Sequence, residues 1–225
     1  RNEESGLRCV YHGWKFDVAG KCLEMPTEPP ESAIKGQIHA KAYPTREQAG
    51  CVWAYLGPPD DIPELPALEW AVVPDSHRYI SKRLQECNWL QALEVDIDSS
   101  HIHYLHGRLD PSPPWVDMAP RFEVKNVSSG LLVAARRDTK EQDKYSWRVN
   151  CVFLPCYTLP PGGDLFPGHA WVPMDDENCW NYSVTWRGTG PLTAADLAVI
   201  RRPTSNYSET LPGTYKNVAN RDNDF

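Results

Sequence analysis

Residues 87–106 read CNWLQALEVDIDSSHIHYLH, and the spacing Glu94-x3-Asp98-x2-His101-x4-His106 places two carboxylates and two imidazoles within thirteen residues. This mixture of hard oxygen and borderline nitrogen ligands suits ferrous iron with open coordination positions, as in two-His-one-carboxylate sites that activate dioxygen. The alternative is an acidic, exposed helix whose end is rich in histidine. Taken alone, the run is compatible both with an iron site and with such an exposed helix.

We expect a helix from about residue 87 to residue 105, because apolar side chains recur there at three- and four-residue intervals. On a regular helix Glu94, Asp98 and His101 would share one face. The helix would then present two carboxylates and one imidazole as a stack.

The second imidazole does not fit a regular helix. His106 is five residues past His101, which corresponds to roughly 140° around an ideal helix. Both imidazoles reach one metal only if the helix ends or distorts after Ser100, for example through a π-type bulge, and we expect such an irregularity. His103 alternates with His101, so we expect it to face away from a shared site and take no part.

A second candidate metal motif, Cys9-Val-Tyr-His12-Gly-Trp-Lys-Phe, lies near the start of the chain. A thiolate and an imidazole at C-x2-H spacing can hold one metal centre from a tight loop, and Gly13 removes a side chain from that loop. The alternative is a buried cysteine and a hydrogen-bonded histidine in a strand turn. A bare C-x2-H spacing favours the alternative.

The continuation of this motif changes that balance. The residues through Asp17 and Gly20, together with the later run Cys51-Val-Trp-Ala-Tyr-Leu-Gly-Pro58, resemble the second half of a Rieske domain. Residues 87–106 resemble the catalytic helix of Rieske non-heme iron oxygenases. Within these the chain looks most like the phthalate dioxygenase class, which includes phenoxybenzoate dioxygenases and related O-demethylating enzymes.

The resemblance implies roles for five residues. Cys9 and His12 would bind a Rieske [2Fe–2S] cluster, in which two Cys hold one iron and two His the other. His101 and His106 would bind a mononuclear Fe(II). Asp98 would bridge His101 to the Rieske histidine of a neighbouring subunit. It would orient both imidazoles and offer a short path for electrons.

Parts of both ligand sets are missing from this stretch of sequence. The family supplies a Cys-x-His pair before the Cys-x2-His pair, and we expect it upstream of Arg1. The third ligand of the mononuclear iron is an Asp on a later helix, expected beyond Phe225, so we assign neither Asp222 nor Asp224 to the iron. Glu94 receives no transferable role. We therefore expect the chain to be a fragment that lacks both ends.

The resemblance also implies partners. The substrates would be dioxygen and an aromatic acid such as phthalate or phenoxybenzoate. The oxygenase would be a homotrimer, and its electrons would come from NAD(P)H through a separate flavin reductase that carries a plant-type ferredoxin domain. Dihydroxylation, monohydroxylation and oxidative demethylation all remain open, because one iron site supports each. An arginine is expected to bind the acid, and the candidates on predicted strands are Arg136, Arg137, Arg148 and Arg187.

Two other classes of protein compete with the oxygenase. A Rieske-type electron carrier without oxygenase chemistry would explain the first motif, but it has no need of the second. A structural zinc module would require closed four-ligand sets of Cys and His, and the two motifs are too far apart in sequence to suggest one.

Bulk composition excludes further classes. The net charge of −7 and 23 scattered basic residues argue against nucleic-acid or anionic-membrane partners. No run approaches the ~18 apolar residues of a membrane span. Seven cysteines form an odd set without repeating spacing, which favours reduced thiols and a cytoplasmic location.

We expect an α+β protein in three parts: the C-terminal part of a Rieske β-domain (1–58), a Pro-rich acidic linker (59–74), and a catalytic domain (75–225) with a mainly antiparallel sheet of the helix-grip type. Thr193 is expected to cap a helix over 194–201. The expected strands are 7–11, 14–18, 51–56, 78–84, 121–127, 131–137, 145–153 and 178–187.

Overall fold

The computed structural model describes residues 1–105 and 115–201. The chain divides into two compact units, Arg1–Ala67 and Leu68–Phe225. The division lies within the segment 59–74 that we expected to link two domains. Part of that segment is ordered into a short helix, α1 (Glu69–Val72).

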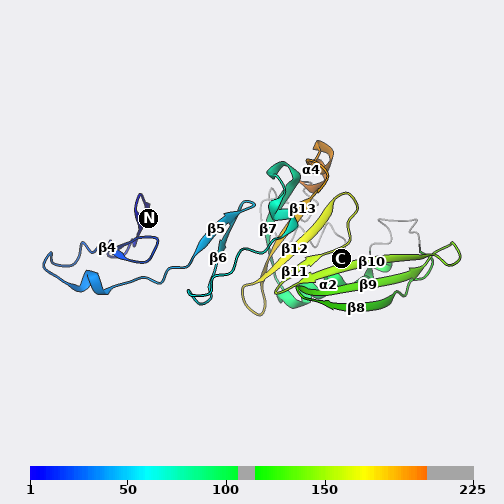
Figure 1. The fold of residues 1–225 in the computed structure, drawn as a ribbon, viewed down its shortest axis with the longest axis horizontal. Coiled ribbons are helices and arrows are strands. Elements are labelled where there is room, and N and C mark those ends of the chain that lie inside the picture. Colours follow the sequence, from blue (N-terminus) through cyan, green and yellow to red (C-terminus); the bar gives the residue numbers. More distant parts are fainter. Residues whose placement is uncertain (106–114, 202–225) are drawn as a thin grey trace. The chain divides into compact units, whose positions relative to one another are not determined.

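The first unit consists of short antiparallel strands and turns (Figure 1). Four strands follow one another in a sheet of order β1-β2-β3-β4, and two more form a separate hairpin. The strands that flank the Cys9–His12 motif are shorter than we expected. The elements are β1 (Asn2–Glu3), β2 (Gly6–Arg8), β3 (Lys15–Phe16), β4 (Cys22–Glu24), the 3-10 helix η1 (Ile34–Gln37), β5 (Thr45–Gln48) and β6 (Cys51–Ala54).

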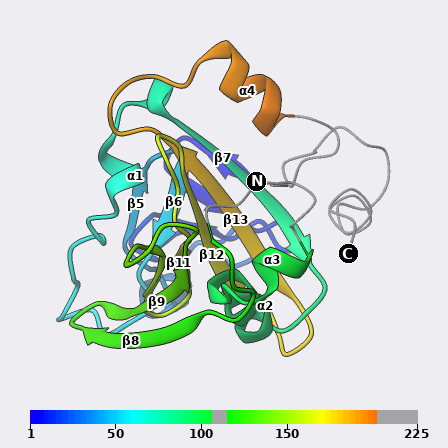
Figure 2. The same ribbon diagram turned by 90° about the vertical axis from the view of Figure 1, so that its right-hand side faces the viewer.

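The second unit is built on a seven-stranded antiparallel sheet of order β7-β13-β12-β11-β10-β9-β8 (Figures 1 and 2). Its strands are β7 (Arg78–Gln85), β8 (Arg121–Val127), β9 (Gly130–Asp138), β10 (Tyr145–Phe153), β11 (Tyr157–Leu159), β12 (Phe166–Pro173) and β13 (Cys179–Trp186). Besides α1 and the 3-10 turn η2 (Asp75–His77), the described helices are α2 (Trp89–Ile97), α3 (His101–Leu105) and α4 (Ala194–Ile200).

The expected fold agrees closely with this sheet, except at β11 and β12. Strands β8 and β10 begin and end at the predicted residues, and α4 has the predicted Thr193 cap, reinforced by Asp196 in a capping box. The sequence from Pro160 to Gly168 is rich in proline and glycine and reads as a turn. The start of β12 nevertheless lies within it, because β12 pairs with β13 along its whole length.

Helix α2 packs against strands β10, β11 and β12 through a small apolar core. The buried members of this core are Ala92, Leu93, Val152, Trp171 and Cys179. The core covers only part of the face of the sheet on which α2 lies.

The same face also buries many polar side chains. Residues directly opposite one another on antiparallel strands point to the same side, and pairing therefore places Ser81, Ser183, His169, Thr158 and Val152 in one row. The buried polar residues of the second unit include seven that lie on strands, all on this face, which we call the helix-side face. They are Ser81, Arg137, Asn150, Thr158, Asn181, Ser183 and Thr185.

Candidate metal centres

The histidine-bearing helix is interrupted, as we expected. The interruption spans Asp98–Ser100, however, and so begins before the predicted point after Ser100. Helix α2 ends at Ile97, Asp98 is extended (φ −74°, ψ 117°), and a new helix, α3, begins at His101. The prediction that Glu94, Asp98 and His101 stack on one regular helix is therefore wrong. Asp98 leaves the helix because its side chain binds nearby backbone groups instead.

Asp98 and His101 still meet, for a different reason. The Asp98 carboxylate accepts the backbone N–H groups of Ser100 (2.7 Å) and His101 (3.1 Å), as an N-cap does, and its Oδ2 lies 3.2 Å from His101 Nδ1. Burial by itself raises the pKa of Asp98, but these hydrogen bonds outweigh it and hold the pKa below its usual value. An ionised Asp98 can only accept a hydrogen bond, so this contact favours the tautomer of His101 that carries its proton on Nδ1.

Cys9 and His12 lie together on an exposed loop between β2 and β3. The loop is closed by hydrogen bonds from Cys9 N to Trp14 O (2.8 Å) and from Gly13 N to Cys9 O (3.1 Å). Gly13 has φ +75°, and a Cβ there would lie 2.8 Å from Pro26, so the turn requires glycine. Backbone N–H groups of Tyr11 and His12 lower the pKa of the Cys9 thiol. This favours the thiolate, the form that binds metals.

These two donor sets fit the groups that the resemblance implies. The first offers an accessible thiolate beside an imidazole. The second offers an imidazole oriented by a carboxylate, which is how metal-binding histidines are usually held. Within residues 1–105 and 115–201, no three Cys, His, Asp or Glu side chains converge on one point. His106 lies outside the described residues, so its predicted ligation stays a prediction.

Two further residues of the 87–106 run have other surroundings. His103 Nδ1 accepts the indole N–H of Trp115 at 3.0 Å. Glu94 is exposed on α2, where it lines a surface recess with Glu86, Asp176 and Glu177. Neither side chain forms a described hydrogen bond with the Asp98 or His101 side chain, although the Asp98 backbone N–H donates to the Glu94 carbonyl (3.1 Å).

Residues 54–225 match the family model described as LigXa C-terminal domain like, and residues 1–44 match the Rieske [2Fe-2S] domain. The chain belongs to the LigXa C-terminal-like family. Its resemblance to Rieske oxygenases is thereby confirmed, as is the α+β fold class.

Several curated relatives of this LigXa-like chain are named as oxygenase subunits. It is 38% identical to the 3-chlorobenzoate-3,4-dioxygenase oxygenase subunit of Comamonas testosteroni, over 84% of this chain and 46% of the relative. It is 42% identical to the 5,5'-dehydrodivanillate O-demethylase oxygenase subunit of Sphingobium sp. (strain NBRC 103272 / SYK-6), over 89% of this chain and 49% of the relative. The chain spans about half the length of these curated relatives.

The fold of the LigXa-like chain is also that of solved Rieske oxygenases. The terminal oxygenase of carbazole 1,9a-dioxygenase from Nocardioides aromaticivorans IC177 matches with a TM-score of 0.59 and 19% identity, covering 89% of this chain and 63% of that one. Among the described residues of our chain, no helix is both long and apolar enough to cross a membrane.

The structure of this LigXa-like chain shows a buried acid–base pair that the sequence did not indicate. Asp96 Oδ2 lies 2.9 Å from Nδ1 of His169 and accepts the hydroxyl of Thr158, which in turn accepts the indole N–H of Trp171 at 3.0 Å. Burial raises the pKa of Asp96, but the charge and hydrogen bonds of His169 and the Thr158 hydroxyl outweigh burial and lower it. His169 lies on β12, a strand that was not among those expected from the sequence.

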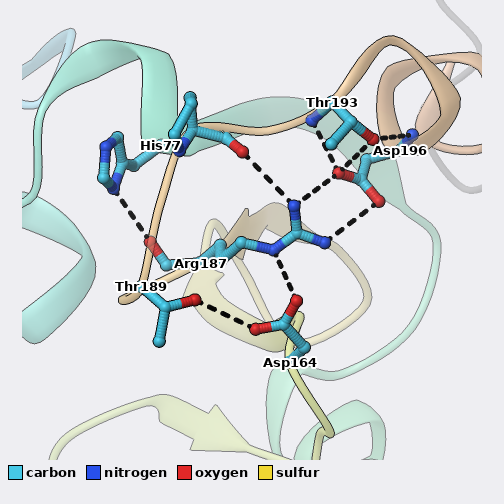
Figure 3. A network of polar contacts seen from close by, with 7 residues as sticks. His77, Asp164, Arg187, Thr189, Thr193 and Asp196 are labelled. Atoms are coloured by element: carbon cyan, nitrogen blue, oxygen red, sulfur yellow. Dashed lines mark hydrogen bonds and ion pairs between the residues drawn. The ribbon is translucent and has the colours of Figure 1, made fainter.

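The four candidate arginines of the LigXa-like chain differ sharply in their surroundings. Arg187 is occupied by two carboxylates: its Nε lies 2.8 Å from Asp164 and its Nη1 lies 3.1 Å from Asp196 (Figure 3). The same network joins the end of β13 to Thr193 and Asp196 at the start of α4, and the backbone N–H of Arg187 donates to His77 O (2.9 Å). Arg187 thus has a structural role, because it connects the end of β13 to the start of α4.

The other three arginines lie on neighbouring strands of the sheet. Arg136 faces away from the helix-side face and lies over the Tyr145 ring at 4.3 Å. Arg137 is 1% exposed on the helix-side face and donates to the Ser99 carbonyl. Arg148 shares that face and has no hydrogen-bond or ion-pair partner among the described residues, although its Nε is buried. Among the described residues, Arg148 is thus the candidate arginine on the helix-side face without a hydrogen-bonded or ion-paired guanidinium.

Proposed function

We propose that this chain is the central part of a terminal oxygenase component that activates dioxygen at a mononuclear iron supplied with electrons by a Rieske cluster. The observation that carries the proposal is the Asp98–His101 pair at the break between α2 and α3, in the same chain as the Cys9–His12 loop. A carrier of electrons alone would have no use for a carboxylate-oriented imidazole in a second unit.

The proposed site residues are Cys9 and His12 for the cluster, His101 and His106 for the mononuclear iron, and Asp98 as the bridge. When bound, the cluster would store single electrons and the ferrous iron would bind dioxygen. Asp98 would hold the proton of His101 at Nδ1 and keep the imidazole in one orientation. Across a subunit interface, its second role would be to accept a hydrogen bond from the partner's Rieske histidine.

The proposed substrate is an aromatic acid. Support comes from the relatives named above, one of which is named for a chlorobenzoate, and from Arg148 on the helix-side face. Burial and the neighbouring charge of Arg137 lower the pKa of Arg148, so an unpaired guanidinium there is costly until an anion binds it. We propose that Arg148 contacts the carboxylate of the substrate.

Partners and location follow from the same proposal. Electrons would come from NAD(P)H through a separate flavin reductase, and the subunits would form a homotrimer, because a head-to-tail interface that closes by rotation lets Asp98 act between neighbours. The seven cysteines are all free, which fits a cytoplasmic location. We further propose the division into a Rieske part (1–58), a linker (59–74) and a catalytic domain (75–225).

Metal and sulfide analysis of the full-length protein tests the proposal. The oxygenase should contain about three irons and two acid-labile sulfides per subunit, whereas an electron carrier should contain about two of each. A structural zinc module should contain no iron. A result of two irons and two sulfides in a folded, trimeric preparation reconstituted with ferrous iron would rule the oxygenase out.

A further inference from the structure

The segment Asp98–Ser100, between α2 and α3, is the part of the chain that sets the position of His101. Such a break leaves backbone carbonyls at the end of α2 without helical partners, and each must find a donor elsewhere when it is buried. Ser99, in the middle of the segment, is 1% exposed. Water therefore does not satisfy its carbonyl, and the protein must.

Two side chains of the sheet provide the donors. Asn150 on β10 uses its Nδ2 for both Ile97 O (3.1 Å) and Ser99 Oγ (3.0 Å). Arg137 on β9 donates from Nη2 to the Ser99 carbonyl. Asn150 is 2% exposed and Arg137 is 1% exposed. Two buried donors from the neighbouring strands β9 and β10 thus hydrogen-bond to the segment between α2 and α3 and stabilise its conformation.

A third contact orients the helix that follows the break. The Arg137 guanidinium lies over the ring of Trp115, 5.0 Å from its centroid, and the Trp115 indole N–H donates to His103 in α3. Arg137 therefore contacts the break directly and α3 through one intermediate. Because His101 is the first residue of α3, a shift in either contact moves its imidazole and the Asp98 carboxylate that faces it.

We infer that Asn150 and Arg137 are positioning residues, which fix the helix break and thereby the geometry of the Asp98–His101 pair. The inference rests on the proposed function only for its consequence, iron binding; the positioning itself is a property of the polypeptide. Neither residue touches the imidazole. Both act through Ser99, and Asn150 also acts through Ile97.

Substitution of Asn150 by leucine in the full-length protein tests this inference, because leucine has a similar volume and no donor. Asn181 provides a matched control: it is 0% exposed, lies on the same face of the sheet, and hydrogen-bonds to Ser183 and not to the break. Asn150→Leu and Asn181→Leu both remove one buried amide from one face. Only the first removes support from residues 98–101.

Two measurements are needed. Amide hydrogen exchange of a peptide covering Ser100 and His101, whose N–H groups Asp98 accepts, should speed up by about tenfold in Asn150→Leu and stay at the wild-type rate in Asn181→Leu. The dissociation constant for ferrous iron should rise by about 10–100-fold in Asn150→Leu alone. The absorbance of the Rieske cluster should not change.

Wild-type exchange and wild-type iron affinity in Asn150→Leu would overturn the inference. So would equal losses in both variants, which would show general destabilisation. If Asn150→Leu does not fold, Arg137→Met, which removes the bond to the Ser99 carbonyl and the guanidinium over Trp115, answers the same question. If even the wild-type protein binds no ferrous iron, the proposed function fails, and the exchange experiment still decides the positioning role.

Discussion

Asp98 Oδ2 and His101 Nδ1 lie 3.2 Å apart at the interruption between helices α2 and α3, and not along one continuous helix. The carboxylate does two jobs at once, because it caps the first turn of α3 and it faces the imidazole of the residue that begins this turn. Orientation of the histidine is therefore coupled to the local backbone. Changes in the break and changes in the carboxylate should have separable effects.

Asp98→Asn in the full-length enzyme should retain most of the mononuclear iron and lower the rate of coupled turnover by about 10–100-fold. The amide keeps one oxygen for the backbone N–H groups but removes the charge that holds His101. Iron analysis and oxygen consumption coupled to product formation measure the two effects. Turnover at the wild-type rate would contradict the bridging role.

His101→Ala should remove the mononuclear iron while the Rieske absorbance remains, because the two proposed ligand sets lie in different units of the chain. His77→Ala is the control in the same unit, and it should keep the iron because the His77 ring contacts the Arg187 carbonyl (3.2 Å) and not the segment between α2 and α3. Loss of both iron signals in His101→Ala would show misfolding and leave its assignment as a ligand without support.

Arg148→Gln should raise the KM for an aromatic acid by about tenfold or more, because a charge-assisted hydrogen bond to a carboxylate is lost. Arg136→Gln is the control on the adjacent strand, since Arg136 faces the other side of the sheet. Steady-state kinetics with an acid and its methyl ester separate charge recognition from shape. An equal KM increase in the two variants would argue against a specific role for Arg148.

The Asp96–His169 pair should make the free energy of unfolding depend on pH in the acidic range. The pKa of Asp96 is lowered in the folded state, so the unfolded chain binds more protons between the two pKa values and stability rises with pH there. The contribution should be complete above the unfolded Asp pKa of about 3.9 and be lost as the pH falls below it. Chemical unfolding of wild type and Asp96→Asn should therefore converge at low pH.

Asp143→Asn, at an exposed loop residue, controls for the loss of one negative charge in that experiment. A stability difference between wild type and Asp96→Asn that stayed constant from pH 6 to pH 2 would mean that the pair does not titrate as described.

Local sequence signals predicted the elements in which local and tertiary preferences agree. Alternating β-branched and aromatic residues predicted the bounds of β8 and β10, and Thr193 predicted the start of α4. The motif residues Cys9, His12, Asp98 and His101 were proposed from spacing and resemblance; the structure brings Asp98 and His101 within 3.2 Å of each other, and the ligand roles stay predictions.

Other features depended on contacts between distant residues and could not be predicted in this way. Apolar periodicity continues through Ile97, and the capping capacity of Asp98 alone did not outweigh it in the prediction. The buried donors that stabilise the end of α2, Asn150 and Arg137, are about 40 to 50 residues away. Strand β12 contains Pro167 and Gly168 and forms because β13 supplies its hydrogen bonds. Because this strand was not predicted, the position of His169 beside Asp96 was not predicted either.

The polar helix-side face has a consequence for anyone who engineers this domain. Buried side chains such as Asn181 and Ser183 contribute less to stability than well-packed apolar ones of the same size. Directed evolution for heat resistance would therefore find its easiest gains on this face, where replacement of Asn150 or Arg137 would loosen the proposed iron site. Libraries aimed at thermostability should hold these positions constant and vary the opposite face of the sheet.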